Sequence, residues 1–137
     1  MTHQSRKEEG QDLLEYALVL PFFFFLTLGI IEFSLLYFQY NTIAHAAREG
    51  ARIGIVMPSA LCDQTCLDEY VASVATAAAA GLNPDNLDVQ VEHPTVSLIT
   101  VVVTYDSGFI TRMAAQAMGQ EDFAVTLQAA STMRRER

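Results

Sequence analysis

The stretch that decides the fold is ALVLPFFFFLTLGIIEFSLLYF, residues Ala17–Phe38, in which Glu32 is the single charged side chain. As a helix it would extend about 33 Å at about 1.5 Å per residue, and the hydrocarbon core of a bilayer is about 30 Å thick. Tyr37 and Tyr40 stand at the outer end, where amphipathic rings favour the membrane interface. The stretch therefore predicts one transmembrane helix in a lipid bilayer.

A cleaved secretory signal peptide is the alternative interpretation of this stretch. A small-x-small cleavage site is present at Ala44-His45-Ala46. However, the apolar run is longer than the apolar region of a signal peptide, which has roughly 7–15 residues. Arg48 and Arg52 also follow soon after it. These features favour a helix that stays in the membrane.

The charge balance bears on partners and on orientation. The formal net charge is −8, and Lys7 is the only lysine. Because a protein must neutralise phosphates to bind nucleic acid, this balance argues against a nucleic-acid partner. Basic residues stand on both sides of the span, Arg6 and Lys7 before it and Arg48 and Arg52 after it, so the positive-inside rule gives close to a tie. The acidic bulk and the cysteines beyond the span favour a cytoplasmic N-terminus.

The two cysteines, Cys62 and Cys66, both follow the span. A pair in a small extracytoplasmic domain most often forms a disulfide. Two cysteines are too few for a structural zinc site, and CxxxC lacks the CxxC spacing of thiol redox enzymes. We therefore expect a Cys62–Cys66 disulfide, with two free thiols as the alternative.

The first helix is expected to continue past the membrane from Gln39 to about Val56, before Pro58. Two rows of small residues follow its turns: Ala44, Ala47 and Ala51, and Ala46, Gly50 and Gly54. Such rows permit close approach of another element. They predict either a seam for another protein or packing against the chain's own sheet, and the sequence leaves both open.

The rest of the chain predicts one helix and three strands. Helical spacing relates Leu67, Val71, Val74 and Ala78, and Gly81 ends that helix. Alternating or β-branched patterns predict strands over residues 87–92, 96–105 and 123–129, while residues 109–118 predict a short helix or a loop. An apolar sheet face must be buried, and the outer half of the first helix can cover it. The expected fold is therefore α+β, a long N-terminal transmembrane helix packed on a small three-stranded antiparallel sheet.

The sequence shows no catalytic grouping. His3, His45 and His93 fall in the leader, the stalk and a turn, without the spacing of metal ligands. The adjacent acids Asp68-Glu69 and Glu121-Asp122 are typical of helix or strand starts, where acids act as caps. We therefore expect no enzyme activity, no metal, no cofactor and no small-molecule substrate.

A processing motif precedes the span. The stretch Gly10-Gln-Asp-Leu-Leu-Glu15-Tyr16-Ala-Leu-Val-Leu-Pro21 resembles the prepilin motif of Flp/Tad pili. The resemblance places cleavage between Gly10 and Gln11, which makes Glu15 and Tyr16 the fifth and sixth residues of the mature chain. The leader departs from the pattern, because Glu8 and Glu9 make it less basic than such leaders tend to be.

Three further stretches resemble the TadE-like pseudopilins: Gly29-Ile-Ile-Glu32-Phe33, Ala46-Ala-Arg48-Glu-Gly50-Ala-Arg52 and the tail Ala130-Ser-Thr-Met-Arg134. The resemblance implies a pilin-like chain with a prepilin-type leader (1–10), a transmembrane helix with its extracytoplasmic continuation (11–56) and a small extracytoplasmic α+β domain (57–137).

The implied function is that of a minor pseudopilin in the assembly of a Tad/Flp-type pilus at the bacterial inner membrane. The implied partners are a prepilin peptidase, other pilins and the Tad inner-membrane machinery. Glu15 is implied to neutralise the new α-amine of Gln11 on a neighbouring subunit; its alternative role is an interfacial acid in the first helical turn. For the whole chain, the alternative is an uncleaved, signal-anchored periplasmic accessory or binding domain.

Overall fold

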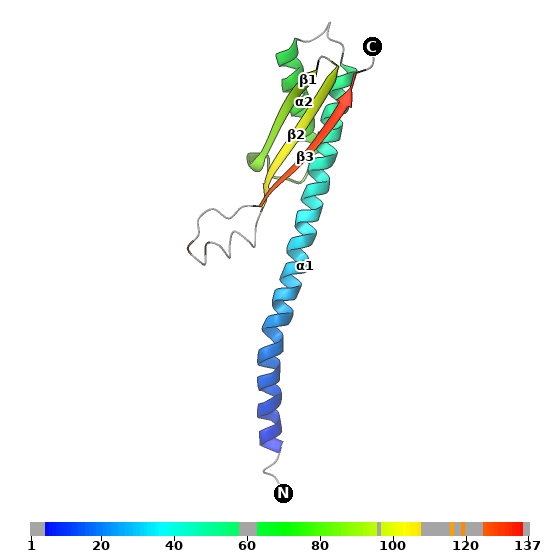
Figure 1. Ribbon diagram of the computed structural model, residues 1–137. Coiled ribbons are helices and arrows are strands. Elements are labelled where there is room, and N and C mark those ends of the chain that lie inside the picture. Colours follow the sequence, from blue (N-terminus) through cyan, green and yellow to red (C-terminus); the bar gives the residue numbers. More distant parts are fainter. Residues whose placement is uncertain are drawn as a thin grey trace. The chain divides into compact units, whose positions relative to one another are not determined.

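The computed structural model describes residues 5–57, 63–95, 97–107, 116, 119 and 125–135. Its elements are, in chain order, α1 (Ser5–Val56), α2 (Gln64–Ala78), the 3-10 turn η1 (Pro84–Asn86), β1 (Leu87–Thr95), β2 (Leu98–Ser107) and β3 (Val125–Arg134) (Figure 1). The chain divides into two compact units, Met1–Leu35 and Leu36–Arg137. The predicted α+β class, with a long N-terminal apolar helix and a three-stranded antiparallel sheet, is confirmed.

The first unit contains the inner part of α1. This helix begins at Ser5, so it already includes most of the leader, whose arginine, lysine and glutamates are good helix formers. Pro21 consequently lies in the helix interior. Most side chains along the span are exposed, among them Phe22 and Phe33 at 70% each, whereas Glu32 is half-buried. Among the described residues, α1 is the one helix long and apolar enough to cross a membrane, which suggests a membrane anchor.

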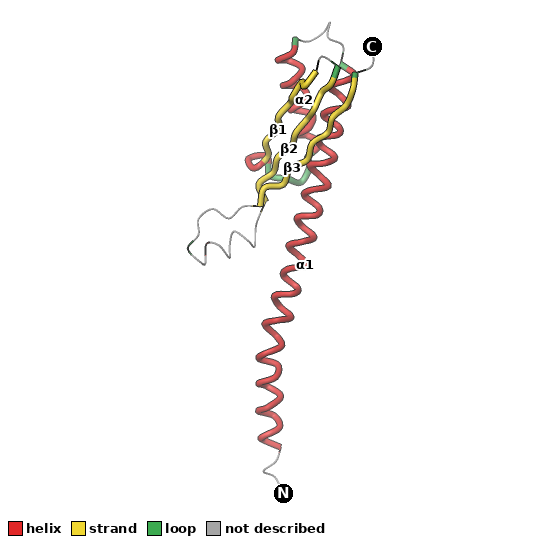
Figure 2. The backbone as a smooth tube through the Cα atoms, in the orientation of Figure 1, coloured by secondary structure: helices red, strands yellow, loops and turns green. Residues whose placement is uncertain are grey.

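The second unit contains an antiparallel sheet in the order β1-β2-β3 (Figure 2). Three rows of partners cross the sheet and define its inner face: Leu87–Tyr105–Leu127, Val89–Val103–Ala129 and Val91–Val101–Ser131. Ile99, Val101, Val103 and Tyr105 are buried, as the alternation of the sequence predicts. The register of β1 shifts between Glu92 and Thr95, a segment that includes Pro94. A proline is tolerated there because β1 is an edge strand.

The core of this unit joins α1, α2 and the sheet. Its largest fully buried side chains are Ile43 on α1, Val71 on α2, and Val101 and Val103 on β2. The small residues of α1 face this core, since a Cβ at Gly50 would lie 3.2 Å from Ala75 Cβ and 3.3 Å from Val101 Cγ1. Of the two interpretations of the small-residue rows, the structure therefore supports packing on the chain's own domain.

The second helix has recognisable ends. The side chain of Asp63 accepts a hydrogen bond of 2.8 Å from the backbone N–H of Gln64, which caps the N-terminus of α2. Beyond the helix, Gly81 has a φ of +88°, a conformation that other residues rarely adopt. The asparagine at position 83 then starts η1, because its side chain accepts from the N–H of Asp85.

The structure corrects three details of the sequence interpretation. His93 lies in β1 and not in a turn, because that strand continues to Thr95. Asp63, and not Asp68, caps α2, since Asp68 lies inside the helix. The strand predicted over residues 123–129 runs from Val125 to Arg134. Apart from Gln116, the predicted helix or loop over residues 109–118 lies outside the described residues.

Candidate functional site

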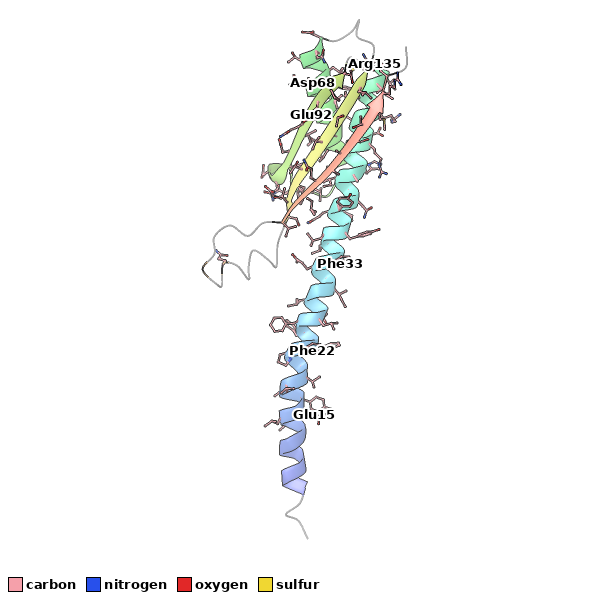
Figure 3. All side chains as sticks on the ribbon, in the orientation of Figure 1. Glu15, Phe22, Phe33, Asp68, Glu92 and Arg135 are labelled. Carbon is pink, nitrogen blue, oxygen red and sulfur yellow. The ribbon has the colours of Figure 1, made fainter. Side chains whose placement is uncertain are left out.

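The predicted processing site lies within α1. The backbone at Gly10 and Gln11 is helical, and the helix passes through both positions without interruption. Glu15 and Tyr16 follow as exposed residues, Tyr16 being 70% exposed (Figure 3). In the uncleaved helix, Glu15 stands ten residues after Ser5, too far for the N-terminal dipole to favour an acid. The interfacial-acid interpretation of Glu15 therefore also requires a helix that starts near Gln11.

The polar side chains of the span differ in how their hydrogen bonds are satisfied. Thr27 donates to the carbonyl oxygen of Phe23 at 2.9 Å, and Ser34 donates to that of Ile30 at 2.8 Å. Such bonds to the preceding turn let a hydroxyl sit in an apolar helix. Glu32 behaves differently, because its Oε2 is buried and has no hydrogen-bond partner in this structure. The span thus contains one acceptor that its own helix does not satisfy.

An ion pair follows on α1 beyond the apolar stretch. Arg52 Nη2 lies 2.5 Å from Glu49 Oε1, and the guanidinium donates to both carboxylate oxygens. The hydrogen bond from Arg52 lowers the pKa of Glu49, and the same bond raises the pKa of Arg52. Because both groups are at the surface, this pair contributes little to stability.

Three polar contacts hold the second unit together, and the sequence interpretation missed all of them. Ser107, at the end of β2, donates a short hydrogen bond to Gln39 Oε1 on α1. His93 Nε2 lies 2.7 Å from Asp68 Oδ1, which joins β1 to α2. Arg135 donates at 2.9 Å to the carbonyl oxygens of both Gly54 and Met57.

These contacts have weak signals in the sequence, because their partners lie 25 to 81 residues apart. Asp68 resembles a capping acid, and Arg135 is one of three arginines in a charged tail. Only the exposure of the last carbonyls of α1 is predictable, since every helix leaves four of them without a partner.

The structure describes one of the two cysteines of the predicted disulfide. Cys66 lies in the first turn of α2, and no cysteine in the described part of the chain is free. Cys62 lies outside the described residues. The pairing of Cys62 with Cys66 stays a prediction.

Within residues 13–57, 63–95, 97–107 and 125–135, no three histidine, cysteine or acidic side chains are grouped so that they could hold a metal ion. The candidate site that the structure presents is the surface of α1: an exposed Glu15 near the predicted cleavage point, an apolar span, and Glu32 with an unsatisfied oxygen.

The comparisons with known proteins concern the same helix. Residues 10–52 match the family described as TadE-like protein. No curated protein matches the chain. No solved structure matches it either. The family match begins at the predicted cleavage point and includes Glu15, Tyr16 and Glu32. Over residues 10–52, the chain thus matches the TadE-like family that its sequence motifs predict.

Proposed function

We propose that this chain is a minor pseudopilin that takes part in assembling a Tad/Flp-type pilus and that a prepilin peptidase cleaves it between Gly10 and Gln11. The observation that carries the proposal is the TadE-like match over residues 10–52, which suggests a role related to Tad pili. The long apolar part of α1 supports this proposal, because pilin subunits reside in a membrane before they assemble.

Cleavage would change the chemistry of the helix start. The new N-terminus at Gln11 carries an α-amine, and an unpaired charge at the edge of the bilayer is costly. Glu15 is exposed and, four residues beyond Gln11, is the last acid before the apolar stretch. The Glu15 carboxylate of one copy can therefore neutralise the Gln11 amine of a neighbour, which would set the axial register as subunits join. Tyr16 lies beside it in the same assembly segment.

The remaining assignments follow from this role. The protein would span the bacterial inner membrane once, with its N-terminus in the cytoplasm and residues 57–137 in the periplasm. Its partners would be other pilins, the Tad inner-membrane machinery, the prepilin peptidase and the surrounding lipids. It would be a structural subunit and a peptidase substrate, without catalysis, cofactor or small-molecule substrate of its own.

The interpretation as a soluble secreted protein, cut after Ala46, fits the structure poorly. Ile43 and Ala46 are fully buried in the core of the second unit. Removing them would expose the apolar side chains that they cover, so the domain would lose part of its own core. The alternative that stands is an uncleaved, signal-anchored periplasmic accessory or binding domain.

The deciding experiment is the intact mass of the protein extracted from membranes of cells with a working prepilin peptidase, with peptide mapping of its N-terminus. A chain that starts at Gln11 supports the pseudopilin role. A chain that retains Arg6 and Lys7 contradicts it and favours the accessory domain. Mass spectrometry is preferable to Edman degradation, because an N-terminal glutamine can cyclise and block the latter.

A second experiment tests Glu15. The variant Glu15→Ala should be inserted, folded and cleaved, yet should fail to support pilus assembly, and Glu15→Asp should retain part of the activity. Glu69→Ala is the matched control, since Glu69 is an exposed acid on α2. Normal piliation with Glu15→Ala would contradict the pairing role.

A further inference from the structure

The span contains an unsatisfied acceptor and an unused donor. Glu32 Oε2 is buried without a hydrogen-bond partner, although Thr27 and Ser34 satisfy theirs within the helix. The Tyr37 side chain is 64% exposed, and its hydroxyl makes no hydrogen bond within the described part of the chain. A polar group without a partner is costly at membrane depth, so both groups favour a contact with another molecule.

Glu32 and Tyr37 of one chain cannot satisfy each other. They are five residues apart on α1, which corresponds to about 140° around the axis of an α-helix. The partner of Glu32, which lies inside the apolar stretch, must therefore come from outside its own helix, and the Tyr37 hydroxyl stays available to a neighbouring helix.

A second copy of this chain is unsuited to bring a cation to Glu32. No lysine or arginine occurs from residue 8 to residue 47, and the nearest one, Arg48, lies about 24 Å along the helix from Glu32. A second copy does offer the Tyr37 hydroxyl, if the two helices are displaced along their axes by about five residues.

The proposed function, on which this inference rests, requires nearly the same displacement. When Glu15 of one copy meets Gln11 of its neighbour, the neighbour is shifted outward by four residues, or about 6 Å. Glu32 of the neighbour then lies at the height of residue 36 of the first copy, about 1.5 Å below Tyr37.

The helical faces agree as well. On the first copy, Glu15 and Tyr37 are 22 residues apart, about six turns of an α-helix. On the neighbour, Gln11 and Glu32 are 21 residues apart, again close to six turns. The face of the first copy that presents Glu15 thus also presents Tyr37, and the face of the neighbour that presents its N-terminus also presents Glu32.

Gly29 leaves room for the tyrosine ring. A Cβ at Gly29 would meet no atom within 4 Å, and this residue lies three positions before Glu32, about one turn nearer the N-terminus. Helical side chains lean toward the N-terminus, so the ring of Tyr37 would extend from its own height toward that of the neighbour's Gly29. A larger side chain there would obstruct the ring.

We infer that Glu32 is a second subunit-contact site in the membrane, where it accepts a hydrogen bond from the Tyr37 hydroxyl of a neighbouring copy. The pair fixes the same axial register as Glu15 and Gln11, but near the outer end of the span. The occupant of this site is a second copy of the chain in parallel orientation.

The test combines cross-linking with substitution in the full chain in membranes. One tagged copy carries Glu32→Cys and the other Tyr37→Cys, and oxidised adducts are identified by the masses of their cross-linked peptides. We expect the mixed adduct to exceed the adducts that each variant forms alone. A dominant Glu32→Cys homodimer would indicate helices without displacement and would overturn the inference.

The second arm measures self-association. We expect Tyr37→Phe to weaken it about threefold to tenfold, as interhelical hydrogen bonds in membranes typically contribute, and Glu32→Ala combined with Tyr37→Phe to weaken it no further. Gly29→Leu should also weaken it. Tyr40→Phe is the matched control, since Tyr40 is a second exposed tyrosine at the outer end. Equal behaviour of Tyr37→Phe and Tyr40→Phe would overturn the inference.

The intact mass of the same samples separates the two proposals. If the chain is cleaved and pilus assembly depends on Glu15, but self-association of Tyr37→Phe equals that of the unchanged chain, only the Glu32 contact is refuted. The pseudopilin role would then stand. A chain that retains the leader would refute the proposed function itself.

Discussion

The guanidinium of Arg135 lies 2.9 Å from the carbonyl oxygen of Gly54, although 81 residues separate the two in the sequence. The same nitrogen also donates to Met57, so the residue that follows β3 satisfies two carbonyls at the end of α1. The last carbonyls of a helix have no intrahelical partner and carry partial negative charge. Arg135 therefore caps α1 and ties the end of the sheet to it (Figure 3).

Replacing this arginine should destabilise the second unit, Leu36–Arg137. We expect Arg135→Met to lower its free energy of unfolding by about 1–3 kcal/mol, because two hydrogen bonds from a charged group are lost. Chemical denaturation of the full chain in detergent measures the change. Arg134→Met serves as the control, since Arg134 is exposed at the end of β3. Equal stability of the two variants would contradict the capping role.

Gly54 should tolerate no larger residue. A Cβ there would clash with Ile99 Cδ1 and would lie 3.4 Å from Val71 Cγ2. We expect Gly54→Ala to cost about 1–3 kcal/mol of stability, as overpacking of a core does. Adding Ile99→Val removes the methyl group that clashes, so the double variant should be less destabilised than the sum of the two single changes. Additive costs would show that the contact is unimportant.

The pair of His93 and Asp68 should contribute a small coupling between β1 and α2. Their side chains are 25% and 35% exposed, so we expect a coupling energy of about 0.5–1 kcal/mol. The variants Asp68→Asn and His93→Gln and their combination form a double-mutant cycle, measured at constant pH by thermal or chemical unfolding. A coupling energy of zero would mean that the contact is incidental.

The ion pair on α1 predicts a pH dependence with a definite sign. The hydrogen bond from Arg52 lowers the pKa of Glu49, so its stabilising effect is present above the ordinary pKa of a glutamate and is lost as the pH falls through the lowered value. Titration by NMR should show a higher pKa for Glu49 in Arg52→Gln. Arg48→Gln is the control, because Glu49 is paired with Arg52 and not with Arg48. An unchanged pKa in Arg52→Gln would contradict the pairing.

Most elements of the fold were predictable because their signals are local. Alternation along residues 87–92 and 96–105 identified two strands and the buried face of β2, since side chains alternate across a strand. The strand predicted to end at residue 129 continues to Arg134. This extension depends on pairing, because Ala130, Ser131 and Met133 have weak strand signals of their own but each has a partner on β2.

The motif of the candidate site also has a local signal in the sequence. Gly10, Glu15 and Glu32 are recognised by their order along one segment, and residues 10–52 match the TadE-like family. The missing hydrogen bond of Glu32 Oε2 was not predictable, because it depends on which side chains of the helix surround the carboxylate.

By itself, the sequence determined the long apolar helix, the TadE-like segment and the α+β class, because hydrophobic length, motif order and periodicity are properties of consecutive residues. The tertiary structure decided which surface covers the small-residue rows of α1. Gly50 and Gly54 could equally have faced another protein, and only the approach of Val71, Ile99 and Val101 in three dimensions turned them toward the chain's own core. It also decided that Arg135 completes α1, since a contact across 81 residues depends on where the folded sheet ends.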